Sequence, residues 1–237
     1  MFSRSVKYYD LIYAARGKDY AREAEIIDGI IRQNCRSSGN KLLDIGCGTG
    51  GHLAHLKHTY VATGLDLDVG MVNVARRRHP SVEFVQGDMQ DFHLGRRFDA
   101  IVSLFSAIGY VQTIDRLNGT LACIAEHLEP GGVVVIEPWL TPEDYVAGTV
   151  HAVHVDEPDL KISRMVVSRA EGRLALLEFH YMIATPGGVE HFTEMHQTGL
   201  FTRDEYLGAF MAAGLDAVHD PEGLGGRGLY VGVRVEG

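Results

Sequence analysis

The sequence feature that most constrains the fold is an apolar run followed by closely spaced glycines, between residues 41 and 51. The run Leu42-Leu43-Asp44-Ile45 is typical of a buried strand, and Gly46, Gly48 and Gly51 follow it in G-x-G-x-x-G spacing. Glycine lets a backbone approach a ligand where a Cβ would clash, and a helix N-terminus presents free N–H groups. The stretch therefore predicts a ligand-binding loop, although an ordinary strand-to-helix connection and a dinucleotide loop share this pattern.

Predicted strands and helices alternate between residues 41 and 138. After the first strand, apolar runs predict strands at 61–66, 82–89, 98–105 and 133–138, and helical spacing predicts helices at 52–58, 69–78 and 117–128. Strands that alternate with helices form right-handed βαβ units, which build a parallel sheet with helices on both faces. The sequence therefore predicts an α/β fold with a Rossmann-like, doubly wound sheet.

A different pattern, of strands without intervening helices, occupies residues 140–201. Strand-like segments at 151–156, 161–169, 174–184 and 191–201 are separated by short turns. Such spacing is typical of hairpins in a small antiparallel sheet. We therefore predict an N-terminal helical lid over residues 1–40, an α/β core formed by residues 41–139 and 202–237, and an antiparallel β insert at residues 140–201 that covers the substrate.

Acidic side chains lie near the predicted carboxyl ends of the strands, where a doubly wound sheet binds its ligand. Asp44 precedes the glycines, Asp66 ends the second strand, and Asp88 follows the third. An NAD site would use Asp66 for the ribose, but Asp44 would repel the pyrophosphate, because like charges at short range disfavour each other. The acids therefore favour a cofactor that carries positive charge and no phosphate.

S-adenosylmethionine is a cofactor of this kind, since it carries an ammonium, a sulfonium and a nucleoside. Asp44 would favour its cationic end, Asp66 would accept hydrogen bonds from both ribose hydroxyls, and Asp88 would accept one from the adenine amino group. Met89 and Leu104 would form apolar walls. We therefore predict S-adenosylmethionine as the cofactor, and an NAD(P)-dependent oxidoreductase is the alternative from a different class.

The net charge and the cysteines restrict the partners of the protein. A formal charge of −9 at pH 7 argues against a nucleic-acid-binding protein, which would present a basic face. Three widely spaced cysteines form neither a disulfide framework nor a zinc pattern, so we expect a reducing cytoplasm and no metal site. No apolar run approaches the roughly 18 residues of a membrane span. We therefore expect a cytoplasmic protein that binds neither nucleic acid nor membrane.

Four motifs together resemble the core of the class I methyltransferases. They are residues 44–50 (Asp-Ile-Gly-Cys-Gly-Thr-Gly), Gly64-Leu65-Asp66, Gly87-Asp88-Met89, and residues 128–132 (Leu-Glu-Pro-Gly-Gly). The resemblance implies a Rossmann-like fold and agrees with the cofactor inferred from the acids.

A narrower resemblance extends over nearly the whole chain. Its motifs lie at residues 9–13, 16–20, 92–98, 105–110, 135–139, 180–181 and 226–229. They are similar to those of the N,N-dimethyltransferases of dTDP-3-amino-3,6-dideoxyhexoses, which act in the biosynthesis of antibiotic sugars such as desosamine and mycaminose. The resemblance implies a dTDP-linked amino-deoxysugar as the substrate.

The resemblance, together with the loop and strand-end argument, assigns expected roles to individual residues. The residues expected around the cofactor are Tyr9, Arg16, Asp44, Gly46, Gly48, Asp66, Asp88, Met89 and Leu104. Those expected around the nucleotide sugar are Tyr20, Arg164, Ser168, His191, His196 and Arg227. Arg227 lies in a Gly-Gly-Arg-Gly loop, and an arginine suits a diphosphate because its fork bonds two oxygens at once.

The implied reaction is an in-line displacement in which a neutral amine attacks an activated methyl group. Positioning supplies most of the catalysis, so a strong base is unnecessary, and Tyr110, His180 and Glu137 are the candidates to collect the proton. Alternatives are a methyltransferase for another small amine or hydroxyl, and a non-catalytic ligand-binding domain. A homodimer is compatible with the sequence, although no stretch identifies an interface.

Overall fold

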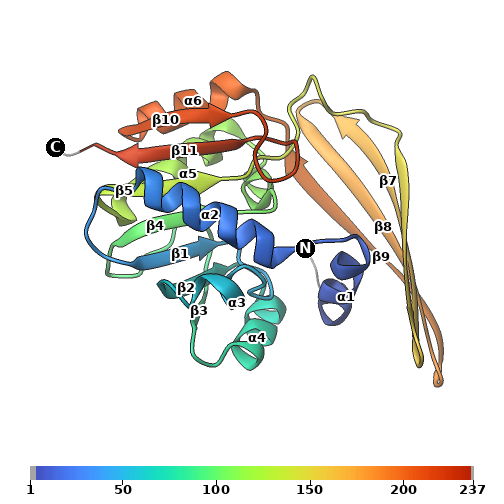
Figure 1. Cartoon of the computed structure of the whole chain (residues 1–237). Coiled ribbons are helices and arrows are strands. Elements are labelled where there is room, and N and C mark those ends of the chain that lie inside the picture. The colour runs from blue at the N-terminus through green and yellow to red at the C-terminus, as the bar shows by residue number, and fades with distance from the viewer. Residues whose placement is uncertain (1–3, 236–237) are drawn as a thin grey trace.

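The computed structural model describes residues 4–235, which form a seven-stranded mixed sheet flanked by helices and a separate four-stranded sheet (Figure 1). The large sheet has the order β10-β11-β5-β4-β1-β2-β3. Its strands are β1 (Lys41–Ile45), β2 (Val61–Asp66), β3 (Glu83–Gln86), β4 (Phe98–Ser103), β5 (Leu128–Ile136), β10 (Leu215–Asp220) and β11 (Leu229–Arg234). All neighbours pair in parallel except β11, which runs antiparallel to β5 and β10.

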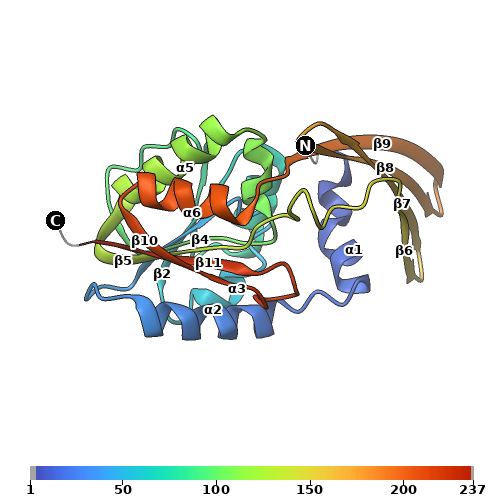
Figure 2. The ribbon, with the colours of Figure 1, turned by 90° about the horizontal axis from the view of Figure 1, so that it is seen from above.

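Helices cover both faces of this sheet, as a doubly wound fold requires (Figure 2). One face packs against α5 (Ile114–His127) and α6 (Arg203–Ala212), and the other packs against α2 (Tyr20–Asn34), α3 (Leu53–Leu56) and α4 (Val69–Arg78). The central strand β4 is buried at every position, because both of its faces are covered. The predicted α/β, Rossmann-like fold is confirmed.

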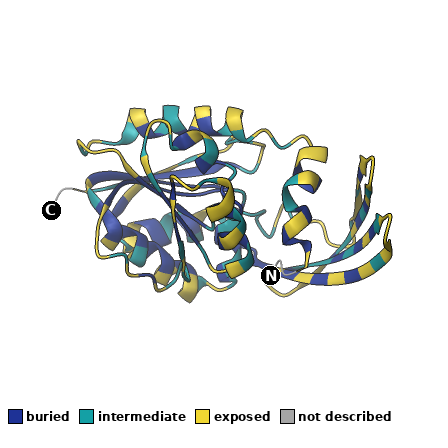
Figure 3. Cartoon of the chain, turned by 90° about the horizontal axis from the view of Figure 1, so that it is seen from below, coloured by how far each residue is buried: buried dark blue, intermediate teal, exposed yellow. Residues whose placement is uncertain are grey.

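The antiparallel β insert forms the second sheet, in the order β6-β7-β8-β9. Its strands are β6 (Val150–Glu157), β7 (Leu160–Glu171), β8 (Leu174–Thr185) and β9 (Gly188–Gly199). Buried and exposed residues alternate along these strands (Figure 3), so one face of the insert is covered and the other is open. The covered face packs its apolar side chains against Tyr8 and Ile12.

Two short helices lie between the core and the insert (Figure 1). They are η1 (Ser5–Tyr8) and α1 (Tyr9–Ala15). The predicted lid extended over residues 1–40, but α2 packs Ala24, Ile27 and Ile31 into the core instead. Its apolar stripe fits the large sheet, so only η1 and α1 occupy the position of a lid.

Two features of the large sheet differ from the sequence prediction. Strand β10 was not predicted, because it is an edge strand whose polar residues alternate with apolar ones over only six positions. Strand β5 begins at Leu128 rather than at Val133, since Leu128 pairs with Phe98 and the register then shifts before Val133. The glycines before Val133 therefore form an irregularity inside the strand and not its start.

None of the helices within residues 4–235 has the combination of length and apolar character that crossing a bilayer would require.

Candidate active site

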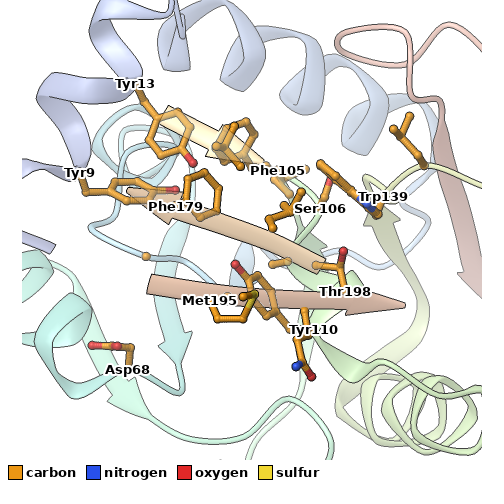
Figure 4. Close-up of a pocket in the computed structure, with 18 of the residues that line it drawn as sticks. Tyr9, Tyr13, Asp68, Phe105, Ser106, Tyr110, Trp139, Phe179, Met195 and Thr198 are labelled. Atoms are coloured by element: carbon orange, nitrogen blue, oxygen red, sulfur yellow. The ribbon is translucent and has the colours of Figure 1, made fainter. Parts of the chain in front are cut away.

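A cavity of about 1260 Å³ lies between the carboxyl ends of the core strands, α1 and the β insert (Figure 4). Pockets for one small ligand usually measure about 300–1,000 Å³. The cavity therefore has room for two ligands side by side, one at the core strands and one under the insert.

Most of the residues predicted around the cofactor line this cavity. They are Tyr9, Arg16, Gly46, Gly48, Asp66, Asp88, Met89 and Leu104. They come from α1 and the segment after it, the glycine loop, and the ends of β2, β3 and β4. The topology thus gathers residues that are far apart in the sequence at the carboxyl edge of the sheet.

The glycine loop and Asp66 are held together by backbone hydrogen bonds. The Asp66 carboxylate accepts from the N–H groups of Gly48 and Asp68, each at 2.8 Å. Gly46 has a φ of +73°, and a Cβ there would lie 2.5 Å from the Cβ of Ala107. Only glycine fits this turn, because both the left-handed backbone and the close approach exclude a side chain.

Asp44 lies behind the loop rather than on the large cavity. It is 1% exposed and lines a cavity of about 30 Å³ together with Tyr9, Tyr20 and His52. Burial, with Asp66 nearby, raises the pKa of Asp44 to about 7. Its Oδ2 has no hydrogen-bond partner within residues 4–235. A buried carboxyl of this kind favours a cationic partner, and pairing with the ligand ammonium stays a prediction for Asp44.

Binding of S-adenosylhomocysteine should therefore strengthen as the pH rises through 7. Below pH 7 the Asp44 carboxyl is protonated and offers no charge to the ligand ammonium, whereas above pH 7 it is ionised. Calorimetric titration at pH 6 and pH 8 should show dissociation constants that differ about 10-fold, the change that one pKa unit represents. The raised pKa also affects folding. As the pH rises from about 4 to 7, the contribution of Asp44 to folding stability falls, because the folded state binds the proton more tightly than the unfolded state does.

The matched variant for this measurement is Asp44→Asn, which keeps the shape of the side chain and removes its titration. It should bind S-adenosylhomocysteine weakly and with no pH dependence in this range. An Asp44→Asn protein that kept the pH dependence of the wild type would assign the titration to another group.

The α1 helix and the segment before it contact the core on one side and the insert on the other. Asp10 accepts a hydrogen bond of 2.6 Å from the Thr49 hydroxyl in the glycine loop and pairs with Arg78 at the end of α4. On the other side, Arg4 pairs with Glu190 of β9 at 2.9 Å. These contacts hold the ring of Tyr9 over the cavity (Figure 4).

Arg164 and Ser168 lie on the covered face of β7 and line the part of the cavity under the insert. Arg164 is 3% exposed, and its guanidinium lies 5.2 Å from the ring centre of Tyr13 and 5.1 Å from that of Phe179. Among residues 4–235 no carboxylate lies within ion-pair distance of the guanidinium, which packs between these two rings instead. A buried charge without a counter-ion is costly, so this position favours an anionic ligand.

Glu137 and Arg227, predicted in separate roles, form an ion pair of 2.5 Å. Glu137 is 1% exposed and also accepts a hydrogen bond of 2.6 Å from the backbone N–H of Phe105. Its carboxylate is occupied by these two donors, so the structure does not support the prediction that Glu137 is a base. Arg227 still lines the cavity, where its side chain lies over the rings of Phe105 and Trp139.

Three other predicted residues lie away from the large cavity. His180 and His191 stack on each other at 5.7 Å on the open face of the insert, opposite to Phe179 and Phe192, because neighbouring residues of a strand point to opposite faces. Tyr20 contacts His52 edge-on beneath the glycine loop and lines only the small cavity. In this structure these side chains therefore do not reach the predicted substrate and proton-acceptor positions.

Tyr110, the remaining proton-acceptor candidate, does line the cavity (Figure 4). Its hydroxyl lies 2.7 Å from Nδ1 of His196, which is buried behind it and 1% exposed. His196, predicted as a substrate contact, does not line the cavity, so it reaches the ligand space only through Tyr110.

Several cavity residues were not predicted from the sequence. They are Tyr13, Phe105, Ser106, Trp139, Phe179 and Thr198, most of them apolar or aromatic (Figure 4). Phe105 and Ser106 have φ angles of 53° and 62°, which are rare for residues other than glycine. Strained backbone of this kind clusters at functional sites, but no sequence pattern marks it here.

Comparison with known proteins agrees with this geometry. Residues 42–132 match the family model of a methyltransferase domain. The chain is 46% identical over 227 residues to the dTDP-3-amino-3,4,6-trideoxy-alpha-D-glucopyranose N,N-dimethyltransferase of Streptomyces venezuelae, and the match covers 95% of each protein.

Two solved structures share the whole fold. DesVI of Streptomyces venezuelae superposes with a TM-score of 0.92 at 44% identity, over 99% of this chain and all of DesVI. CalS10, a S-adenosylmethionine-bound amino pentose methyltransferase from Micromonospora echinaspora, superposes with a TM-score of 0.87 at 35% identity, over 99% of this chain and 98% of CalS10. The resemblance and the cofactor predicted from the sequence are confirmed. The chain belongs to the dTDP-amino-sugar N,N-dimethyltransferase family of S-adenosylmethionine-dependent class I methyltransferases.

Proposed function

We propose that this protein transfers two methyl groups, one after the other, from S-adenosylmethionine to the amino group of a dTDP-linked amino-deoxysugar. The observation that carries the proposal is the buried, uncompensated guanidinium of Arg164 in a cavity large enough for two ligands. Arg227 lines the same cavity. Two arginines beyond the cofactor loop suit a diphosphate, because each fork can bond two of its oxygens.

The residues at the carboxyl edge of the core fit the cofactor. Asp66 would hold the ribose hydroxyls, Asp88 the adenine amino group, and Asp44 the ammonium. Two observations support this fit. Oδ2 of Asp44 has no hydrogen-bond partner among the described residues and can therefore bond to a cationic group of the ligand. The turn at Gly46 leaves no room for a side chain, so the backbone can approach the cofactor closely. Arg16 at the mouth of the cavity would pair with the cofactor carboxylate.

When bound, S-adenosylmethionine supplies a methyl group that its sulfonium already activates. The protein then has to align the amine with that methyl group and exclude water. Tyr9 and Tyr13 from α1 and Phe179 from the insert form an aromatic roof (Figure 4). Arg164 and Arg227, which line the same cavity, would hold the diphosphate end. Orientation of this kind can contribute about 7 kcal/mol or more to lowering the barrier.

The experiment that tests the proposal is thermal unfolding with a small panel of ligands. A ligand that binds the folded state raises its stability by mass action, by about 2.7 kcal/mol at 100 times its dissociation constant. We expect S-adenosylhomocysteine and dTDP each to stabilise the protein, and their effects to add because they occupy different parts of the cavity. Stabilisation by NADH and not by S-adenosylhomocysteine would contradict the proposal. Stabilisation by S-adenosylhomocysteine but not by dTDP would favour another small amine or hydroxyl acceptor.

We also propose that the protein acts in the cytoplasm as a homodimer. The open face of the insert supports this, because Met165 and Met182 are each about half exposed on one sheet surface. Light scattering should give twice the mass of one chain, and Met182→Glu should shift the protein to a monomer. The mass of a single chain for the wild type would contradict the dimer.

A further inference from the structure

Each methyl transfer requires the sugar nitrogen to be neutral, although an alkyl amine carries a proton near pH 7. The proton has to leave before the nitrogen can attack, and it has to leave again before the second methyl group is added. Two of the three predicted proton acceptors are excluded by their positions, since Glu137 is paired with Arg227 and His180 lies on the open face of the insert. The inference that follows rests on the proposed function and concerns the third, Tyr110.

Tyr110 connects the cavity to a buried histidine and carboxylate. Its hydroxyl lies 2.7 Å from Nδ1 of His196, and Nε2 of His196 lies 3.9 Å from Oε2 of Glu194. A hydroxyl that donates to Nδ1 requires the neutral imidazole to carry its own hydrogen on Nε2, which is the nitrogen that faces the carboxylate. His196 and Glu194 are both buried, on the covered face of β9.

The Glu194 carboxylate is fixed in place by the lid. It accepts hydrogen bonds from the Ser5 hydroxyl at 2.5 Å and from the backbone N–H groups of Ser5 and Arg4 at 3.1 and 2.9 Å. These contacts join η1 to β9 and hold the carboxylate beside His196. The hydroxyl, the imidazole and the carboxylate lie in the same order as in a Ser-His-Asp triad, where the carboxylate orients the histidine and stabilises its protonated form.

We propose that Tyr110, His196 and Glu194 form a relay that removes the proton from the substrate amine. The N–H bond of the sugar ammonium breaks and its electron pair stays on nitrogen, while the proton bonds to the Tyr110 oxygen. The original Tyr110 proton moves to Nδ1 of His196, and the resulting imidazolium faces Glu194. One positive charge has then moved from the sugar to the imidazole. The proton returns through Tyr110 to water after product leaves, so that the relay is ready for the second methyl transfer.

The electrostatics of the buried groups suit these roles. Burial lowers the pKa of His196 below its usual value, against the opposing effect of Glu194, so the imidazole is neutral at pH 7 and its Nδ1 lone pair faces the Tyr110 hydroxyl. Burial raises the pKa of Tyr110, so the phenol passes a proton on and does not lose it outright. Among residues 4–235, the charged and titratable groups that face His196 are Glu194, Arg164 and Tyr110, and the ring of Phe179 packs against it edge-on. Tyr110 is a catalytic residue in this scheme, and His196 and Glu194 are positioning residues that act through it.

The test is the pH profile of kcat and KM for the dTDP-amino sugar with His196→Gln. We expect kcat to fall about 100-fold at pH 7, the lower end of the usual effect of general acid–base catalysis, with the KM of the sugar nucleotide unchanged. The loss should shrink as the pH rises toward 9, because hydroxide then deprotonates the amine. Glu194→Asp should retain more activity than Glu194→Gln, since it keeps a carboxylate beside the imidazole.

His191→Gln is the matched control, because His191 lies on the same strand but on the open face. It should match the wild type at every pH. Tyr110→Phe keeps the ring and removes the hydroxyl, so it should show the same loss that high pH restores, even if His196→Gln fails to fold.

A kcat loss that is equal at all pH values in both variants, or a rise in KM alone, would overturn the relay. Wild-type protein that does not methylate the sugar would instead contradict the proposed function, so the two failures are distinguishable.

Discussion

Replacing Arg164 with methionine should lower kcat/KM for the dTDP-amino sugar about 100-fold and leave the affinity for S-adenosylhomocysteine unchanged. The guanidinium is 3% exposed, lies between the rings of Tyr13 and Phe179, and has no counter-ion within the described residues. A hydrogen bond to a charged group contributes about 1.5–3 kcal/mol, and 1.4 kcal/mol corresponds to a factor of ten. Steady-state kinetics with varied sugar nucleotide measures this loss.

The same substitution should leave the melting temperature of the ligand-free protein unchanged or raise it. A buried cation without a partner costs desolvation energy, and methionine has a similar unbranched stem that fills the space. Loss of activity without loss of stability distinguishes a ligand-binding arginine from a structural one.

Arg169→Met is the control for both measurements. Arg169 lies on the same strand, is 59% exposed and pairs with Glu178 on the open face of the insert. It should leave activity and stability as they are. If Arg164→Met weakened S-adenosylhomocysteine as much as the sugar nucleotide, Arg164 would belong to the cofactor site and the diphosphate assignment would fail.

Replacing Asp66 with alanine should weaken S-adenosylhomocysteine binding about 100-fold and abolish its stabilising effect at moderate ligand concentration. The Asp66 carboxylate orients the glycine loop through Gly48 and lines the cavity, where it would accept hydrogen bonds from the ribose hydroxyls. Removing it deletes charged hydrogen bonds to the ligand, each of about 1.5–3 kcal/mol. Calorimetric titration measures the change directly.

Asp216→Ala provides the comparison, because Asp216 is an exposed acid on the edge strand β10. Its S-adenosylhomocysteine affinity should equal that of the wild type. Asp66→Glu should fall between the two, since it keeps the charge but moves it by one methylene. Wild-type affinity in Asp66→Ala would remove the ribose assignment.

The sequence predicted the core and the cofactor site because their signals are local. Continuous apolar runs identify buried strands, and Asp44 lies within such a run, while Asp66 ends one and Asp88 follows one. The carboxyl ends of parallel strands meet at one edge, so residues read one strand at a time assemble without further information. Only the position of Asp44, behind the loop in a separate small cavity, required the structure.

The positions of the predicted substrate-binding residues depend on contacts between parts of the chain that are distant in the sequence. Strand alternation places His180 on the same face as Glu178 and Met182, but it does not show whether that face is the open one. The packing of η1 and α1 on the other face decides that. The ion pair of Glu137 with Arg227 joins residues that are 90 positions apart in the sequence, and no local sequence pattern predicts it.

The protein is expected to dimethylate the amine of a dTDP-linked amino-deoxysugar, with S-adenosylmethionine as the methyl donor. The most direct measurement is mass spectrometry of the products after the purified protein is incubated with S-adenosylmethionine and either dTDP-3-amino-3,6-dideoxyhexose or its 4-amino isomer. We expect one of these sugars to gain first one and then two methyl groups, with one S-adenosylhomocysteine formed for each. Formation of no methylated sugar from either isomer, by protein that binds S-adenosylhomocysteine, would contradict the account.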